Sequence, residues 1–201
     1  MLIYALQGIG YGFAAAVQPG PFQTYLISQT LKNGWRRTLP AALAPLISDG
    51  PILALMLLVL SQMPGWLTRF LYIAGGCFIL YLALGGFRAW RSFSVTSPAA
   101  VESSQRSVFK AAITNLLNPN PYIYWGLVTG PILIAGWRQN PVNGIGFLIG
   151  FYATIVSTNG GTILLFGTAR QLGPKVNHAL LGISAIALAC FGVYQLWRGL
   201  Q

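Results

Sequence analysis

Long apolar stretches separated by short polar connections run along the chain from end to end. Each stretch has about 20 residues or more, the length that an α-helix needs to cross the hydrocarbon core of a bilayer. The six stretches cover residues 2–31, 39–60, 66–87, 109–134, 142–166 and 179–197. The pattern therefore predicts an all-α polytopic membrane protein with six transmembrane helices.

Closely spaced prolines interrupt the first and the fourth of these stretches. The first contains Gln18-Pro19-Gly20-Pro21, and the fourth contains Asn118-Pro119-Asn120-Pro121. Because proline lacks a backbone donor and clashes with the preceding turn, each motif is expected to split its helix in two. Broken backbone is tolerated at membrane depth where it is buried in protein or lines a wet cavity. Both motifs are thus candidates for a solute site, with a packed proline kink as the alternative.

The landmarks of the first three stretches recur in the last three. Asp49 in the second stretch corresponds to Asn159 in the fifth. The Trp90-Arg91 pair that follows the third stretch recurs as Trp197-Arg198 at the end of the sixth. Since each half has an odd number of spans, the second half enters the membrane from the opposite side. We therefore expect two inverted three-helix repeats with broken first helices, residues 1–91 and 108–201. A Ser-rich linker, residues 92–107, joins them.

Composition and charge agree with this class and exclude others. Hydrophobic residues make up 55% of the chain and charged residues 7%, against about 25% charged in soluble domains. The net charge of +10 comes from 12 Lys and Arg against Asp49 and Glu102. Most of the cations fall in the first, third and fifth connections, so the positive-inside rule makes those connections cytoplasmic and places both termini outside. The expected partner is the lipid bilayer, not nucleic acid.

Four motifs share one depth in the predicted membrane. At a rise of about 1.5 Å per residue, Pro21, Pro119, Asp49 and Asn159 each lie roughly 14–18 Å from basic residues at the cytoplasmic surface. Half of a hydrocarbon core of about 30 Å is about 15 Å. We therefore expect the four motifs to meet at a midplane site.

The residues at that level suit a small zwitterion. The half-helix after each break offers unpaired N–H groups and a positive dipole end to a carboxylate. Free carbonyls before the break, together with Asp49, suit an ammonium group, a proton or Na⁺. The expected substrate contacts are Gln18, Pro19, Gly20, Pro21, Phe22, Tyr25, Asn118, Pro119, Asn120, Pro121, Tyr122, Trp125, Thr158 and Asn159, with Tyr124 as a further wall residue.

Asp49 is the carboxylate of the predicted spans and is assigned to ion or proton coupling. A charged carboxylate at that depth costs about 2.5–3.5 kcal/mol on insertion scales, so such a residue is functional by default. The alternative is an aspartate that is protonated or paired with Gln18 or Asn118. Its counterpart, Asn159, cannot take up a proton. The coupling group is therefore expected in one half only.

Other small and polar residues carry weaker signals. Cys77 and Cys190 lack metal-ligand spacing and are expected to be buried, inert thiols. We expect no catalytic residue, no metal site and no cofactor, and therefore no enzyme. The pairs Gly8/Gly12 and Gly146/Gly150 have the spacing typical of helix-packing faces, which leaves a homodimer open.

The ordered combination of motifs resembles the LysE/RhtB family of small bacterial inner-membrane exporters. The resemblance rests on Pro19-Gly20-Pro21 in the first span, Asp49-Gly50 in the second, the linker, and Asn118-Pro119 in the fourth. It implies export of amino acids or close derivatives, driven by the proton gradient or membrane potential. Many similar proteins carry a lysine after the Asn-Pro, where this chain has Asn120. The substrate can therefore differ from lysine, threonine or homoserine.

Two other functions remain open from the sequence. One is an exporter of an inorganic cation, as in cadmium-resistance relatives, although the spans lack the cluster of carboxylate, histidine and thiolate that would bind one tightly. The other is a membrane partner or lipid-handling protein without transport activity.

Overall fold

The computed structural model describes residues 1–58, 65–92, 103–169 and 172–201, and within these ranges every regular element is a helix. The all-α prediction is confirmed. The elements are α1 (Leu2–Val17), α2 (Pro21–Asn33), α3 (Trp35–Thr38), the 3-10 helix η1 (Leu39–Leu43), α4 (Ala44–Leu58), α5 (Gly65–Arg91), α6 (Ser104–Leu116), α7 (Pro119–Tyr124), the π-helix η2 (Trp125–Thr129), α8 (Gly130–Gln139), α9 (Pro141–Ala169) and α10 (Pro174–Leu200).

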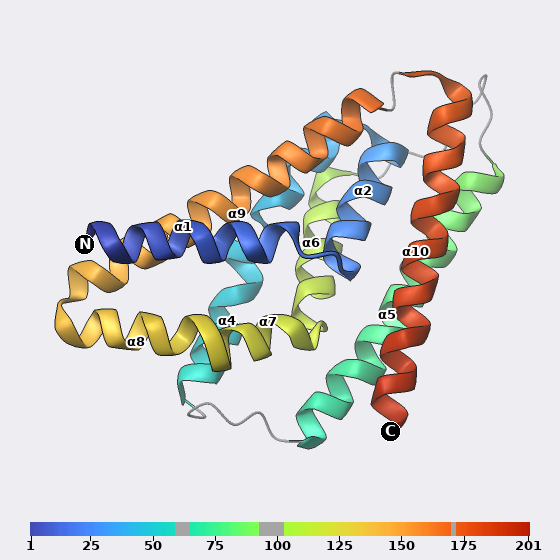
Figure 1. Cartoon of the computed structure of the whole chain (residues 1–201). Coiled ribbons are helices and arrows are strands. Elements are labelled where there is room, and N and C mark those ends of the chain that lie inside the picture. The colour runs from blue at the N-terminus through green and yellow to red at the C-terminus, as the bar shows by residue number, and fades with distance from the viewer. Residues whose placement is uncertain (59–64, 93–102, 170–171) are drawn as a thin grey trace.

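The first proline motif divides its apolar stretch into α1 and α2. Helix α1 ends at Val17, and Gln18 takes an extended conformation (φ −63°, ψ 120°). Gly20 is the N-cap of α2, and Pro21 occupies the first helical position, where its missing N–H would be unpaired in any case. The chain turns sharply at this point, so that α2 leaves the break at a steep angle to α1 (Figure 1).

The second motif divides the fourth stretch in the same way. Helix α6 ends at Leu116, and α7 begins at Pro119. The Asn118 side chain caps α7, because its Oδ1 accepts a hydrogen bond from the Asn120 N–H at 3.1 Å. After the six residues of α7, the π-helix η2 leads into α8, and the chain runs away from the break (Figure 1).

Four segments of the described chain are long and apolar enough to cross a membrane. They are Trp35–Met56, Gly65–Arg91, Pro141–Ala169 and Pro174–Leu200. The other two predicted spans are the ones that the proline motifs divide. Pro51 lies inside α4 without ending it, so Gly50-Pro51 is not a third break. The predicted linker lies largely outside the described residues, and α6 begins within its last part, at Ser104.

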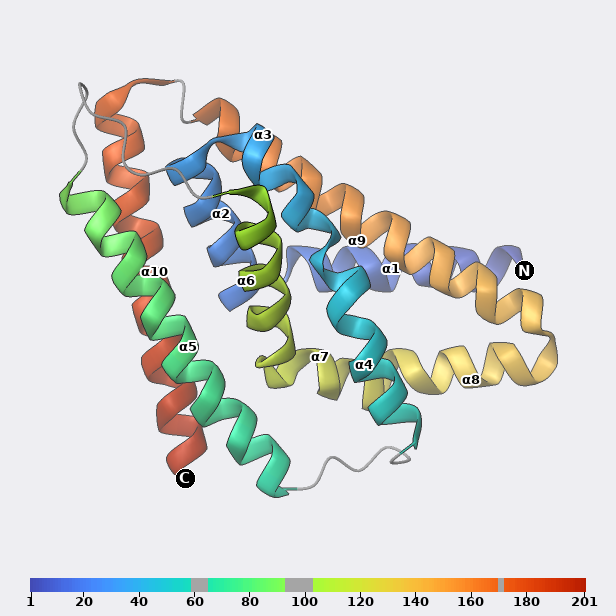
Figure 2. The ribbon, with the colours of Figure 1, turned by 180° about the vertical axis from the view of Figure 1, so that it is seen from behind.

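Helices α5 and α10 pack side by side in opposite directions (Figure 2). Gly76 and Gly192 lie at the middle of their contact: a Cβ on Gly76 would lie 3.0 Å from the Gly192 carbonyl oxygen. Towards one end, a Cβ on Gly182 would lie 2.8 Å from Trp90 Nε1, and towards the other, Arg69 Nε donates to the Gly199 carbonyl at 3.0 Å. Small residues therefore let the two backbones approach closely.

A second glycine seam joins α1 to α9. A Cβ on Gly8 would overlap the carbonyl oxygen of Phe147, and one on Gly150 would overlap that of Ala5. A Cβ on Gly12 would lie 2.5 Å from the Phe151 carbonyl oxygen. The expectation that these glycines form a helix-packing face is confirmed. The face is used within the chain.

The cysteines differ from the expectation. Cys77 on α5 and Cys190 on α10 are both exposed, not buried. The paired helices meet through their glycines, which turns these thiols to the outer faces. A thiol is apolar enough to face hydrocarbon, so a membrane helix does not need to bury it.

Helices α2, α4 and α6 lie between the α5/α10 pair and the group formed by α1, α8 and α9 in both views (Figures 1 and 2). Two clusters of buried side chains form the core, and each draws on helices of more than one group. One gathers around Tyr25, Leu26 and Ile163, and the other around Trp125, Phe147 and Phe151. The two proline breaks lie in the region where the groups meet, which determines the position of the candidate site.

Candidate functional site

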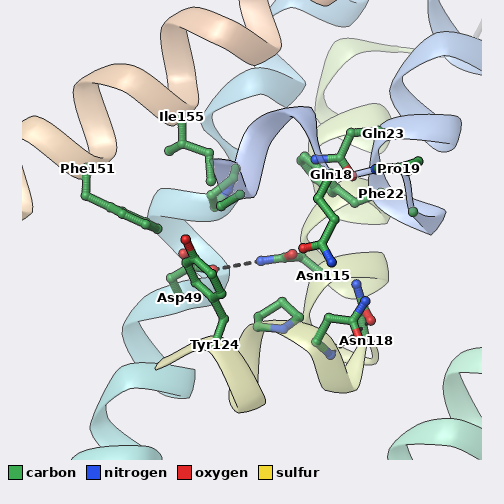
Figure 3. A pocket seen from close by; sticks show the side chains of 15 residues that line it. Gln18, Pro19, Phe22, Gln23, Asp49, Asn115, Asn118, Tyr124, Phe151 and Ile155 are labelled. Carbon is green, nitrogen blue, oxygen red and sulfur yellow. Dashed lines mark hydrogen bonds between the residues drawn. The ribbon is translucent and has the colours of Figure 1, made fainter. Parts of the chain in front are cut away.

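The two breaks border one cavity of about 70 Å³. Its walls come from the end of α1, the start of α2, the middle of α4, the end of α6, α7 and the middle of α9 (Figure 3). The lining residues are Ala15, Gln18, Pro19, Gly20, Phe22, Gln23, Pro45, Asp49, Asn115, Asn118, Asn120, Pro121, Tyr124, Phe151 and Ile155.

Asp49 lies at the wall of this cavity with its side chain 3% exposed. Asn115 Nδ2 donates to Asp49 Oδ1 at 2.7 Å, and Trp125 Nε1 donates to Asp49 Oδ2 at 3.4 Å. Both donors are neutral groups. The carboxylate is therefore held by hydrogen bonds that leave its charge, when ionised, without a compensating side-chain cation at these contacts.

Asn115 ties two helices together at this point. Its Nδ2 also donates to Ser48 Oγ at 2.7 Å, while the Ser48 hydroxyl donates to the Ala44 carbonyl at 3.0 Å. The last turn of α6 is thereby fixed to the middle of α4. Because the buried polar atoms of this group satisfy one another, the rotamer of Asp49 is well determined.

The two breaks present different groups to the cavity. The N-terminus of α7 is capped by Asn118, whereas α2 has no side-chain cap. The first backbone hydrogen bond of α2 is donated by the Thr24 N–H to the Gly20 carbonyl, at 3.0 Å. The N–H groups of Phe22 and Gln23 precede it and lie among the orphan donors that every helix start carries.

The Gln23 side chain also binds the end of α1. Its Nε2 donates to the Ala16 carbonyl at 3.2 Å, which occupies one of the free carbonyls at the end of α1. The side chain thus spans the break and holds α1 and α2 at their relative angle. Figure 3 shows Gln23 and Gln18 beside each other at the edge of the cavity.

Aromatic rings close the wall on the side of α9. Tyr124 OH donates to the Tyr11 carbonyl at 2.9 Å, and the Trp125 ring lies 5.0 Å from that of Phe151. The π-helix that follows Tyr124 shifts the register of the side chains, and its Thr129 hydroxyl donates to the Tyr124 carbonyl at 3.1 Å. Such π-turns are frequent at functional sites because they redirect one side chain. Trp125, the first residue of this π-helix, contacts Asp49.

Nine of the residues expected from the sequence line this cavity. They are Gln18, Pro19, Gly20, Phe22, Asp49, Asn118, Asn120, Pro121 and Tyr124.

The remaining expected residues lie around it or elsewhere. Pro21 and Pro119 are buried first residues of their helices. Tyr25 donates its hydroxyl to the Ser107 carbonyl at 3.3 Å, and Tyr122 donates to the Leu116 carbonyl at 2.9 Å. Trp125 reaches the cavity only through Asp49. These side chains support the site but do not form its wall.

Thr158 and Asn159 do not line the cavity. Asn159 is 1% exposed, and neither of its amide atoms has a hydrogen-bond partner among the described residues. The reason lies in helix periodicity. Ile155 and Phe151, one and two turns earlier on the same face of α9, fill the position that depth alone assigned to Asn159.

Several lining residues were missed from the sequence, namely Ala15, Gln23, Pro45, Asn115, Phe151 and Ile155. A helical spacing of three or four residues connects most of them to residues that were expected. Asn115 lies three residues before Asn118, Ala15 three before Gln18, and Pro45 four before Asp49. That spacing was available as a signal. No signal pointed to Phe151, whose place depends on the glycine seam between α1 and α9.

One comparison with known proteins identifies the family of this chain. A family model described as LysE type translocator matches residues 13–199, which is nearly the whole chain. Comparison with curated proteins and with solved structures gave no match. The match includes both proline breaks, Asp49 and the paired helices α5 and α10. The chain therefore belongs to the LysE type translocator family and is a multi-pass membrane transporter.

Proposed function

We propose that this transporter exports small amino acids or related zwitterions from the cytoplasm by alternating access. The observation that carries the proposal is the cavity itself, where an uncapped helix start and a buried carboxylate lie on opposite sides of one small space. Broken helices around a buried polar cavity are the usual form of a solute site in secondary transporters.

The two sides of the cavity complement a zwitterion. The free N–H groups and positive dipole end of α2 suit the substrate's carboxylate. Asp49 suits its ammonium group, and Gln18, Asn118 and Asn120 add neutral hydrogen-bonding groups between them. A volume of about 70 Å³ is below the roughly 150 Å³ of a cavity that holds benzene, so larger side chains require the cavity to open.

Alternating access follows from six spans arranged as two inverted repeats of three. Each repeat consists of a broken helix, a second span and a long third helix. In the first half these are α1 with α2, then α3 with α4, then α5. In the second half they are α6 to α8, then α9, then α10. The antiparallel contact of α5 with α10 supports this arrangement. Rocking of one half against the other would expose the central cavity to each side in turn. In this proposal the termini are outside and the membrane is the inner membrane.

Asp49 is the proposed coupling group. A carboxylate whose donors among the described residues are neutral must gain a proton, a cation or the substrate's ammonium to be neutralised in the membrane. Export driven by a proton gradient or by the membrane potential would follow from the exchange of these partners at one residue.

Transport in proteoliposomes tests the proposal. Vesicles that contain the purified full chain and unlabelled small amino acids should take up the same radiolabelled amino acid by counterflow. Asp49→Asn keeps the shape of the side chain, so it should abolish accumulation driven by an imposed pH gradient or membrane potential. Absence of counterflow for every zwitterion, or driven accumulation that Asp49→Asn leaves unchanged, would overturn the proposal.

A further inference from the structure

A second cavity lies where the ends of α2 and α5 meet α6. Its volume is about 380 Å³, within the range of about 300–1,000 Å³ that small-molecule sites occupy. It shares no lining residue with the central cavity. Along α2, Ser28 of this cavity lies five positions after Gln23 of the central one, which corresponds to roughly 8 Å. The two cavities are therefore separate places on the same helix.

Three cationic side chains line this cavity, one from each of three helices. Lys32 lies in the last turn of α2, Arg88 in the last turn of α5, and Lys110 in α6. Lys110 Nζ also lies 5.7 Å from the centre of the Tyr81 ring. None of the lining residues, which all belong to the described part of the chain, is Asp or Glu. The field inside the cavity therefore favours an anion.

Neutral donors complete the lining. Ser28 and Gln29 on α2 are 4% and 7% exposed, and Ser92 lies at the end of α5. A guanidinium group, two ammonium groups, hydroxyls and an amide provide more hydrogen-bond donors than a carboxylate can use. Phosphate, with its several acceptor oxygens, matches this set.

The cavity adjoins apolar surface on one side. Tyr81 and Leu84 of α5 line it and are each 59% exposed. They belong to a helix long and apolar enough to span a membrane. A phosphate group held in the cavity could thus carry hydrocarbon chains along α5.

We propose that Lys32, Arg88 and Lys110 form a binding site for a phosphate group, carried either by an anionic lipid or by a free phosphorylated metabolite. The site is independent of the substrate cavity and of the identity of the transported solute.

Thermal stabilisation of the purified full chain in a neutral detergent tests the site. The probes are dioleoylphosphatidylglycerol, dioleoylphosphatidylcholine and glycerol 3-phosphate. Phosphatidylglycerol should raise the melting temperature by several degrees more than phosphatidylcholine if a lipid is the source. Glycerol 3-phosphate should give a comparable rise by itself if a free metabolite is the source. Equal effects of both lipids together with no effect of glycerol 3-phosphate would overturn the proposal.

Charge-removing variants locate the binding. Lys32→Gln and Arg88→Gln should each lose at least half of the stabilisation. Arg37→Gln removes one exposed cation of α3 that does not line the cavity, so it should keep the full effect. A similar loss in Arg37→Gln would show general attraction to a basic surface and would overturn the proposal.

A variant that keeps every charge separates binding from folding. Gly85 lines the cavity, and a Cβ there would meet nothing within 4 Å, so Gly85→Leu should fill the cavity without disturbing the helices. The variant should abolish the stabilisation by whichever probe, phosphatidylglycerol or glycerol 3-phosphate, stabilises the wild type. Gly161→Leu, at an equally open position on α9, should preserve it. Full stabilisation of Gly85→Leu would overturn the proposal.

Discussion

Asn115 Nδ2 lies 2.7 Å from Asp49 Oδ1, and this hydrogen bond joins the last turn of α6 to the middle of α4 (Figure 3). The same nitrogen donates to Ser48 Oγ. A residue directly before one proline break thus holds the carboxylate that we propose as the coupling group. Movement of the α6 end during transport would change the environment of Asp49 directly.

Asn115→Ala should lower both stability and transport. The variant removes two buried hydrogen bonds, one of them to Asp49, while the hydrogen bond from Trp125 to Asp49 remains. Hydrogen bonds of this kind contribute about 1–2 kcal/mol in membrane and buried settings. The expected result is a melting temperature several degrees below that of the wild type, measured in detergent.

The exchanged pair Asp49→Asn/Asn115→Asp serves as the control. It retains one amide and one carboxylate between the same helices, so it should recover most of the lost stability. It moves the carboxylate to α6, so it should not recover driven transport. Recovery of transport in the exchanged pair would contradict the role of Asp49.

Trp125→Phe should slow transport while it largely preserves the fold. Phenylalanine keeps the ring contact with Phe151 but cannot donate to Asp49. Because the hydrogen bond is long, at 3.4 Å, its loss should be worth about 0.5–1.4 kcal/mol, or about two- to tenfold in rate. Counterflow rates in proteoliposomes measure the effect. The matched variant Trp66→Phe, at a side chain 72% exposed, should transport like the wild type.

Gly130→Ala tests the π-turn. A Cβ on Gly130 would overlap the Trp125 carbonyl oxygen, so alanine should distort the turn that begins at Trp125 and shift its contact with Asp49. Overpacking of this kind costs about 1–3 kcal/mol. Transport by Gly130→Ala should fall, and adding Trp125→Phe should reduce it little further, because both act through one contact. If the two changes reduced the transport rate by fully additive amounts, Gly130→Ala would act through something other than the contact of Trp125 with Asp49.

Gly8→Ala should destabilise the protein although alanine is the better helix former. The added methyl group would overlap the Phe147 carbonyl oxygen across the seam between α1 and α9. We expect a loss of about 1–3 kcal/mol, seen as a lower melting temperature. Gly10→Ala is the matched control two residues away. Its Cβ meets nothing within 4 Å, so it should gain up to about 1 kcal/mol from helix propensity. Equal effects of the two changes would contradict the packing of the seam.

Much of the fold followed from the pattern of the chain. Apolar length required membrane helices, since no other structure satisfies the backbone of such segments in lipid. The closely spaced prolines of each motif favoured a break, and Pro21 and Pro119 take the first position of the helix that follows, where the missing N–H is not needed. A single proline is tolerated inside α4, where Pro51 does not end the helix.

The composition of the site was predictable in part. The motifs that contain Pro21, Pro119 and Asp49 were expected to meet because these residues lie at similar distances from the basic surface residues. The structure brings Gln18, Asn118 and Asp49 of these motifs to one cavity. Depth measures only position along the membrane normal. Counting residues gives that position only to within a turn or two of helix. The wall is formed one and two turns before Asn159 on the same face of α9, by Ile155 and Phe151.

The sequence by itself determined the class of the protein, the position of both helix breaks and the single carboxylate near them, because these depend on local chemistry and on the length of apolar segments. Tertiary structure alone decided that Asn115 and Trp125 hold Asp49 and that α9 closes the cavity with Phe151. It also decided that Lys32, Arg88 and Lys110 share a second cavity. Such contacts depend on the rotation and close approach of helices far apart in the chain, which the glycine seams set and which no local pattern records.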